Sequence, residues 1–240
     1  MLSHNLFIIV TSMNSALELD AVAQSQHNEQ LIVDSQLPEE IQTRLARLFP
    51  EYQPTSFRDW INAWSEHLNL GGGSLSPDDL RATTPSPIES EIYVTAADGS
   101  VFGEISPDFH GVLVPIVISI VAGDSVGIEA DCPHNGDEIA LETTSDGVIS
   151  TPSDVVISFG VPSDLADGSS IEGSEFLYDQ LCSYAIPFSS TDAYENWADE
   201  TTTATTVALS LEDTYDVALE AYRAAERRAL SSSEFHCNCC

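Results

Sequence analysis

The sequence predicts an α+β fold: a small helical N-terminal module, then a mixed or antiparallel β-sheet domain with flanking C-terminal helices. Helix-period apolar stripes with capping residues lie on both sides of a central region rich in β-branched residues. Two Asp-Gly pairs, at 98–99 and 146–147, separate β-rich segments as hairpin turns do. With 240 residues and 42% hydrophobic content, the chain can bury a sizeable core.

Four regions are expected along the chain. Residues 1–35 show no sustained period and are rich in Gln, Asn and Ser, so we expect a weakly ordered leader. Residues 36–87 form the helical module, which ends at the segment TTPSP. Residues 88–229 form the α+β domain, and residues 230–240 are expected to be a flexible, Cys-rich tail.

The helical module is expected to contain three helices. In residues 37–49 an opening proline precedes apolar positions that share one face, namely Ile41, Leu45 and Leu48. The second helix runs over residues 56–71, with Ser56 as its N-cap and Asp59 three positions later. A third, short helix follows the Ser-Pro pair at 76–77.

The domain that follows is expected to begin with strands. EIYVTA and SVFGEI, within residues 91–105, form a hairpin around the first Asp-Gly pair. The run VLVPIVISIVAG, residues 112–123, is apolar and rich in β-branched residues, so we expect a buried strand. SVGIEAD, EIALETT and VVISFGV continue the sheet.

The last helix is expected to start after Ser210, with Asp213 in its first turn. Arg227 and Arg228 are expected to close it, because cations are favoured at the negative end of the helix dipole.

Charge excludes several classes of partner. The chain has 39 acidic residues against 7 basic ones, all arginine, and a formal net charge of -32. Such a surface repels nucleic acid and anionic lipid, so we expect neither as a partner. The carboxylates are spread singly among apolar residues, which indicates adaptation to molar salt, where the Debye length falls to roughly 3 Å.

Targeting and disulfide patterns indicate a cytoplasmic protein, and the acidic charge indicates that its cell is salt-adapted. The apolar runs at residues 6–10 and 112–123 are too short for a signal peptide core or a membrane span. Five cysteines, an odd number, do not make a disulfide framework in a chain of this length. We therefore expect the cysteines to be available as thiols.

Three short motifs contain candidate functional residues. GDSVG, residues 123–127, matches a nucleophile elbow, but a strand-like segment follows where a helix is required, so Ser125 is interpreted as a turn residue. Cys132 and His134 lie in DCPHNGDE; they do not complete a zinc site, and a structural cysteine is favoured. The tail FHCNCC combines soft-metal ligands, namely His236, Cys237, Cys239 and Cys240; the alternative is a fortuitous tail.

LCSYAIPFSSTDAYENWADE followed by VALSLEDTYDVALEAYRAA resembles the C-terminal part of the alkylmercury lyase (organomercurial lyase) family. The matching positions are a cysteine followed by an aromatic at a strand end, a helix with a tryptophan, and the last helix: Cys182, Phe188, Trp197 and Leu211 onward. The order of the elements before them also agrees, so the resemblance extends over roughly residues 37–228.

The resemblance implies protonolysis of carbon-mercury bonds, with no cofactor required. Two thiolates bind the mercury, which is a soft metal, and a carboxylic acid protonates the departing carbon. One family thiol corresponds to Cys182. In residues 101–115, where the family has its other cysteine and an aspartate, the acid corresponds to Asp108 and Ile105 stands in place of the cysteine; Glu104 or His110 could occupy the site in a shifted register.

The missing thiol leads to three hypotheses. In the first, an organomercurial lyase uses Cys182, Asp108 and a tail thiol, because residues 229–240 can reach roughly 20 Å. In the second, the same scaffold captures mercury or another soft metal without breaking a bond. In the third, an inactive scaffold serves as a regulatory or interaction protein. We expect an organomercurial or soft metal ion and small thiols as partners.

Overall fold

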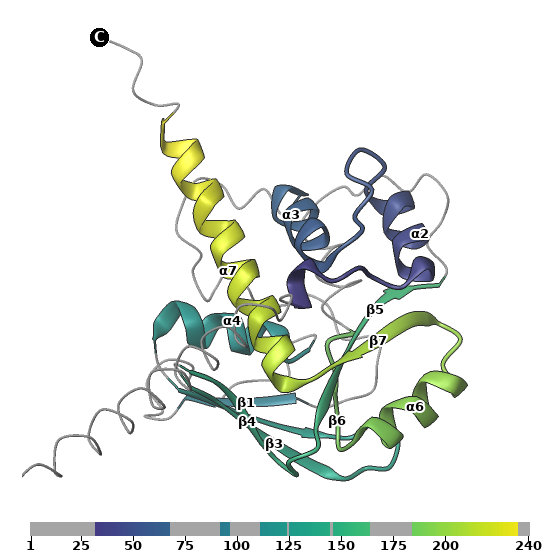
Figure 1. The fold of residues 1–240 in the computed structure, drawn as a ribbon. Helices are drawn as coiled ribbons and strands as arrows, with labels where there is room; N and C mark the ends of the chain where they lie inside the picture. The colour runs from purple at the N-terminus through teal and green to yellow at the C-terminus, as the bar shows by residue number, and fades with distance from the viewer. Residues whose placement is uncertain are drawn as a thin grey trace, which may run out of the picture. The chain divides into compact units, whose positions relative to one another are not determined.

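The structure is a computed structural model, and it describes residues 32–67, 92–96, 111–123, 125–144, 146–163 and 184–234. These residues form two antiparallel sheets with helices packed around them (Figure 1), which confirms the predicted α+β class. The chain divides into two units, Met1–Leu31 and Ile32–Cys240, and every described residue belongs to the second.

The first sheet has four strands in the order of the chain: β1 (Ile92–Ala96), β2 (Val126–Asp131), β3 (Glu138–Thr144) and β4 (Gly147–Thr151). Buried and accessible side chains alternate along β2 and β3, so this sheet has one face on the core and one outward face. The second Asp-Gly pair connects β3 to β4, as predicted. The first pair and the SVFGEI arm of the expected hairpin lie outside the described residues, and the observed partner of β1 is β2.

The prediction for residues 112–123 is wrong, because this run forms helix α4 (Leu113–Ala122). Pro115 is tolerated because the first turn of a helix has no internal acceptor for its N–H groups. The helix ends at Gly123, whose left-handed φ of 70° lets its N–H donate to the carbonyl of Ser119 at 2.9 Å. A helix buried on nearly all sides has no polar face, so periodicity cannot separate it from a buried strand.

The second sheet has the order β6 (Pro187–Phe188), β5 (Val156–Pro162), β7 (Ala204–Leu209). β5 is its central strand and is buried along almost its whole length. Helix α6 (Thr191–Glu200) connects β6 to β7, and the Ser190 side chain caps it by accepting from the Ala193 N–H at 3.2 Å. β7 was not expected from the sequence.

The two described helices of the N-terminal module are α2 (Glu39–Leu48) and α3 (Phe57–His67). The predicted face of α2, Ile41, Leu45 and Leu48, is buried. Ser56 and Asp59 form the predicted capping box, since each side chain accepts from the other's backbone N–H at 3.1 Å. The third expected helix lies outside the described residues.

These helices share one core with the sheets. Phe57 of α3 meets Phe159 of β5 edge to face, with ring centroids 6.0 Å apart. The core also extends before residue 36: the 3-10 turn η1 (Ile32–Asp34) buries Val33, so the last residues of the expected leader are ordered by packing.

Helix α7 (Leu211–Glu234) crosses the molecule and packs against α3, α4 and β4 (Figure 1). Its start agrees with the prediction, because Ser210 Oγ accepts from the Asp213 N–H at 3.1 Å. Its end does not. The helix continues four residues past the expected start of the tail at 230, and Arg227 binds an internal glutamate instead of closing the helix.

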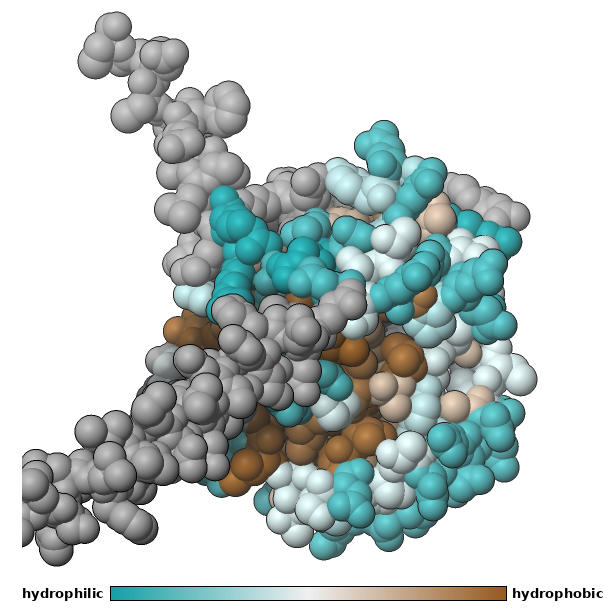
Figure 2. Space-filling model, in the orientation of Figure 1, coloured by the Kyte–Doolittle hydropathy of each residue, from teal (hydrophilic) through white to brown (hydrophobic). Residues whose placement is uncertain are grey.

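Figure 2 shows how polarity is distributed on one face: hydrophilic side chains cover the margin where α2 and α6 lie, and hydrophobic ones gather toward the middle. Within the described ranges, no helix combines the length and apolar character that crossing a bilayer requires.

Candidate functional site

The residues predicted to bind mercury or donate a proton, Asp108, Cys182, His236, Cys237, Cys239 and Cys240, all lie outside the described residues. The same holds for Glu104, Ile105 and His110. The described residues that follow Asp108 and Cys182 in the chain do define a common location, at the junction between α4 and β5.

At this junction Gly111 and Ala185 form an isolated parallel bridge, and the Val112 N–H donates to the Ala185 carbonyl at 2.8 Å. Gly111 comes three residues after Asp108, and Ala185 comes three residues after Cys182. The fold therefore hydrogen-bonds together the two segments that directly follow the predicted acid and the predicted thiol. The two segments are more than 70 residues apart in the chain, so no local sequence pattern predicts that they are close.

Strand β5 holds the same segment from its other side. The hydroxyl of Ser158 donates to the Tyr184 carbonyl at 2.7 Å, and the Ser158 N–H donates to the Ile186 carbonyl at 2.9 Å. The side chains of Ser158 and Ala185 are 0% exposed and that of Ile186 is 1% exposed, so these bonds lie in a dry interior.

An aromatic cluster follows the junction, as the resemblance implies. Phe188 of β6 lies 4.9 Å from Trp197 and 5.5 Å from Tyr194, both on α6, between ring centroids. The Tyr194 hydroxyl pairs with Thr206 Oγ1 of β7 at 3.0 Å. Burial raises the pKa of Tyr194, and this hydrogen bond offsets part of the effect. These contacts attach α6 to the second sheet.

Cys132 is the buried structural cysteine that the sequence favours. Its side chain is 2% exposed, and its backbone exchanges hydrogen bonds with Gly136 and Asp137 in the β2–β3 connection. The Asp137 carboxylate accepts from Ser189 Oγ at 3.0 Å, which ties this connection to the end of β6. His134 is exposed.

The GDSVG motif has the reverse topology of a nucleophile elbow. Helix α4 precedes it and strand β2 follows it, whereas the elbow needs a strand and then a helix. Ser125 lies in the connection between α4 and β2 and is half-buried there.

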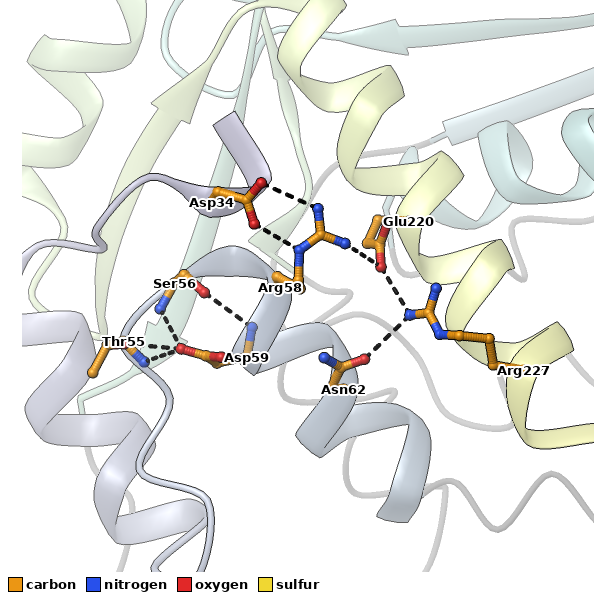
Figure 3. Close-up of polar contacts among 8 residues, drawn as sticks. All are labelled: Asp34, Thr55, Ser56, Arg58, Asp59, Asn62, Glu220 and Arg227. Carbon is orange, nitrogen blue, oxygen red and sulfur yellow. Dashed lines mark hydrogen bonds and ion pairs between the residues drawn. The ribbon is translucent and has the colours of Figure 1, made fainter. Parts of the chain in front are cut away.

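A charged cluster around one buried glutamate joins η1, α3 and α7 (Figure 3). Its centre is the Glu220 carboxylate, with a side chain 4% exposed. One of its oxygens, Oε1, lies 2.6 Å from Arg58 Nη1 and 2.8 Å from Arg227 Nη2. Arg58 also binds Asp34, with Nε 2.6 Å from Oδ1.

The geometry of this cluster indicates a structural role. The pKa of Asp34 lies below its usual value, mainly because Arg58 donates a hydrogen bond to it. In turn, Asp34 and Glu220 raise the pKa of Arg58. Each guanidinium is therefore occupied by acids of the chain itself.

The outward face of the four-stranded sheet carries two hollows of about 360 and 390 Å³. Both lie over small residues of the strands, such as Ala140, with carboxylates such as Glu129 at their edges. Within the part of the chain that the structure describes, no group of three or more His, Cys, Asp or Glu side chains is arranged to hold a metal ion.

Sequence reasoning missed Ser158 and Glu220, although each leaves a sign in the sequence. Ser158 is a lone hydroxyl in the otherwise apolar run VVISFGV. Glu220 falls on the apolar face of the last helix, among Val217, Ala218, Ala221 and Ala224.

Comparison with known proteins gives a consistent result. The model of the alkylmercury lyase family matches residues 112–223. An alkylmercury lyase of Clostridium butyricum is 26% identical over 223 residues, which cover 82% of this chain and 97% of that protein. An alkylmercury lyase of Bacillus cereus is 26% identical over 203 residues, covering 75% of this chain and 88% of that protein. A crystal structure described as the mercury-bound form of MerB2 aligns with a TM-score of 0.43 and 15% identity, over 79% of this chain and 93% of that chain.

Proposed function

Because the chain is a divergent member of the alkylmercury lyase family, we propose that it binds organomercury compounds through thiols and cleaves their carbon-mercury bond by protonolysis. The observation that carries this proposal is the family match over residues 112–223, a range that includes Cys182. The bridge between Gly111 and Ala185 supports it, because it joins the segments that follow Asp108 and Cys182. No resident cofactor is required.

In the proposed reaction, Cys182 loses its proton to solvent and binds the mercury as a thiolate. Asp108 then donates a proton to the carbon while the carbon-mercury bond breaks, and the bonding electron pair stays with the carbon. The products are the hydrocarbon, an Asp108 carboxylate and a mercuric ion on the thiolate. Small thiols remove that ion, and solvent returns the proton to Asp108.

The source of the second thiol is constrained by α7. This helix of 24 residues is about 36 Å long, and it starts just after Leu209, which pairs with Ile157 beside the junction. Over that length the helix carries the chain away from its start, and it ends at Glu234. We therefore propose that a small thiol completes the ligand set, and that Cys237, Cys239 and Cys240 act as a separate acceptor of mercury.

The test is benzene release from phenylmercury by the full-length protein, in molar potassium chloride with excess small thiol. We expect release from the wild type, loss of release in Cys182→Ser, and a rate close to wild type after deletion of residues 236–240. The control is Cys132→Ala, which removes a buried thiol and should keep activity. Release that is unaffected by Cys182→Ser would contradict the proposal.

A second function, capture without cleavage, is favoured by one observation: residues 101–115 contain no cysteine. Capture would appear as stoichiometric, Cys182-dependent mercury binding without any benzene release. Absence of both binding and release would leave the inactive scaffold, the third hypothesis.

A further inference from the structure

The segment Tyr184–Ile186 is held by three hydrogen bonds, because each of its three backbone carbonyls accepts from a different donor group. The Tyr184 carbonyl accepts from Ser158 Oγ at 2.7 Å. The Ala185 carbonyl accepts from the Val112 N–H at 2.8 Å, and the Ile186 carbonyl accepts from the Ser158 N–H at 2.9 Å. The donors come alternately from β5 and from the start of α4, so the segment is fixed on both sides.

One of these three bonds depends on a side chain. Two of the donors are backbone N–H groups, which any residue other than proline supplies. The third is the Ser158 hydroxyl, in a strand where the neighbouring side chains, Ile157 and Phe159, are apolar and buried. Without that hydroxyl the buried Tyr184 carbonyl loses this partner, which is unfavourable in a dry interior. Tyr184 is also the residue of this segment nearest to Cys182 in the chain.

A second feature keeps β5 close to Tyr184. At Gly160, two residues after Ser158 on the same strand, an added Cβ would lie 3.2 Å from the Tyr184 Cβ and 2.6 Å from Thr206 Cγ2. The glycine therefore allows a close approach that a larger residue would prevent. Ser158 and Gly160 thus act at two successive positions on one face of β5.

From these contacts we propose that Ser158 is a positioning residue for Cys182, acting through the backbone of Tyr184. The inference rests on the proposed function for its consequence in turnover, and on the geometry of β5 for the positioning itself. Ser158 touches neither mercury nor the reacting carbon in this proposal. It fixes the backbone at Tyr184, two residues after Cys182 in the chain, and we expect the reactivity of the thiol to depend on this anchor.

The experiment compares Ser158→Ala with Thr143→Val in the full-length protein. Thr143 is a matched control, because its hydroxyl is also fully buried, donates to Ser119 Oγ at 2.7 Å, and belongs to the other sheet. Two rates are measured in molar potassium chloride: iodoacetamide labelling of Cys182, followed by mass spectrometry of its peptide, and phenylmercury capture. Thermal melting is recorded for each variant.

We expect both variants to melt at a lower temperature than the wild type. Only Ser158→Ala should change the labelling rate of Cys182, and in this variant phenylmercury capture should be about tenfold slower. Ser158→Thr, which keeps the hydroxyl, should restore both rates, and Ser158→Val, its isostere without the hydroxyl, should not. The Thr and Val pair makes the same comparison if Ser158→Ala does not fold. Equal labelling of Cys182 in Ser158→Ala, Thr143→Val and the wild type would overturn the inference.

The two proposals fail in different ways. If the wild type neither captures nor cleaves phenylmercury, the proposed function is wrong, and the labelling rates still decide whether Ser158 positions Cys182. If the wild type is active and Ser158→Ala labels and turns over as the control does, the function stands and the positioning role is wrong.

Discussion

The helices around the two sheets are held by different interactions: apolar packing in the case of α4, and arginine contacts in the case of α2 and α3. Helix α4, which packs on the four-stranded sheet, carries no charged residue, and its polar contact to that sheet is the hydroxyl pair of Ser119 and Thr143. By contrast, Arg44 of α2 donates to the carbonyl of Ser163, just after β5, at 2.8 Å, and Arg58 of α3 pairs with Glu220 of α7. The contacts of Arg44, Arg58 and Arg227 thus hold α2, α3 and α7 in place.

This difference indicates where an acidic chain needs its few cations. The chain has only 7 arginines for 39 acidic residues. Nevertheless, two of these arginines, Arg58 and Arg227, bind the same buried carboxylate. Arg58 and Arg227 lie on α3 and α7, which pack against each other, and α3 also meets β5 through the ring contact of Phe57 with Phe159. We infer that the three-stranded sheet, whose central strand β5 is buried and lies beside the junction at Ala185, tolerates substitution poorly, whereas the four-stranded sheet, with one face open, tolerates it well.

The largest effect is expected from matched glycine substitutions in the two sheets. In Gly160→Ala, the new Cβ would lie 3.1 Å from the Thr205 carbonyl oxygen and 2.6 Å from a stiff β-branched side chain, so we expect a loss of about 3 kcal/mol in unfolding free energy. In Gly127→Ala, the near atom is Thr95 Oγ1 at 2.9 Å; Thr95 is exposed and has room to change its rotamer, so we expect about 1 kcal/mol. Denaturant unfolding measures both, and equal losses would contradict the comparison.

The next effect concerns the charged cluster. Glu220→Ala leaves two guanidiniums without their shared acceptor, and since Arg58 and Arg227 are 34% and 55% exposed they can rehydrate in part. We expect a loss of about 2 kcal/mol, below the range for fully buried pairs. Glu195→Ala, the same change at an exposed position of α6, is the control and should change stability by less than about 0.5 kcal/mol. Equal effects would mean that the cluster contributes nothing to the packing of α7.

A smaller effect is the acid dependence contributed by the α3 capping box. Burial alone would raise the pKa of Asp59, but hydrogen bonds from Thr55 and Ser56 outweigh it and leave the pKa below its usual value. A carboxyl with a lowered folded-state pKa stabilises the fold above its unfolded pKa of about 3.9, and this contribution is lost as the pH falls through the folded value.

Asp59→Asn removes this titration, so the stability difference between wild type and variant should shrink as the pH falls below about 4. Unfolding is measured from pH 7 to pH 3 at constant salt. Asp154→Asn, an exposed loop carboxylate beside the four-stranded sheet, controls for the loss of one charge. A pH-independent difference for Asp59→Asn would exclude the capping carboxylate as the source.

The smallest effect is expected on the open face of the four-stranded sheet. Ile149 is 59% exposed and lies opposite Glu142, so Ile149→Thr keeps the β-branched shape and removes little buried surface. We expect a change within about 0.5 kcal/mol in unfolding free energy. A loss comparable to that of Glu220→Ala would indicate that this face is covered in solution.

The sequence determined the elements whose information is local. The capping box of Ser56 and Asp59, the Ser210 cap, the buried face of α2 and the strands β2 and β3 are all confirmed. Each rests on residues a few positions apart, so that propensity, pattern and capping agree. The missing cysteine in residues 101–115 and the family resemblance were also visible in the sequence alone.

Tertiary structure decided what depends on distant partners. Residues 113–122 form a helix because they are buried against β2, β3 and α7, and an apolar run of that length carries no period that separates helix from strand. The bridge from Gly111 to Ala185, and the bonds from Ser158 to the segment after Cys182, join residues far apart in the chain. Such contacts form because they satisfy buried carbonyls and exclude water, and no local pattern encodes which partner does so.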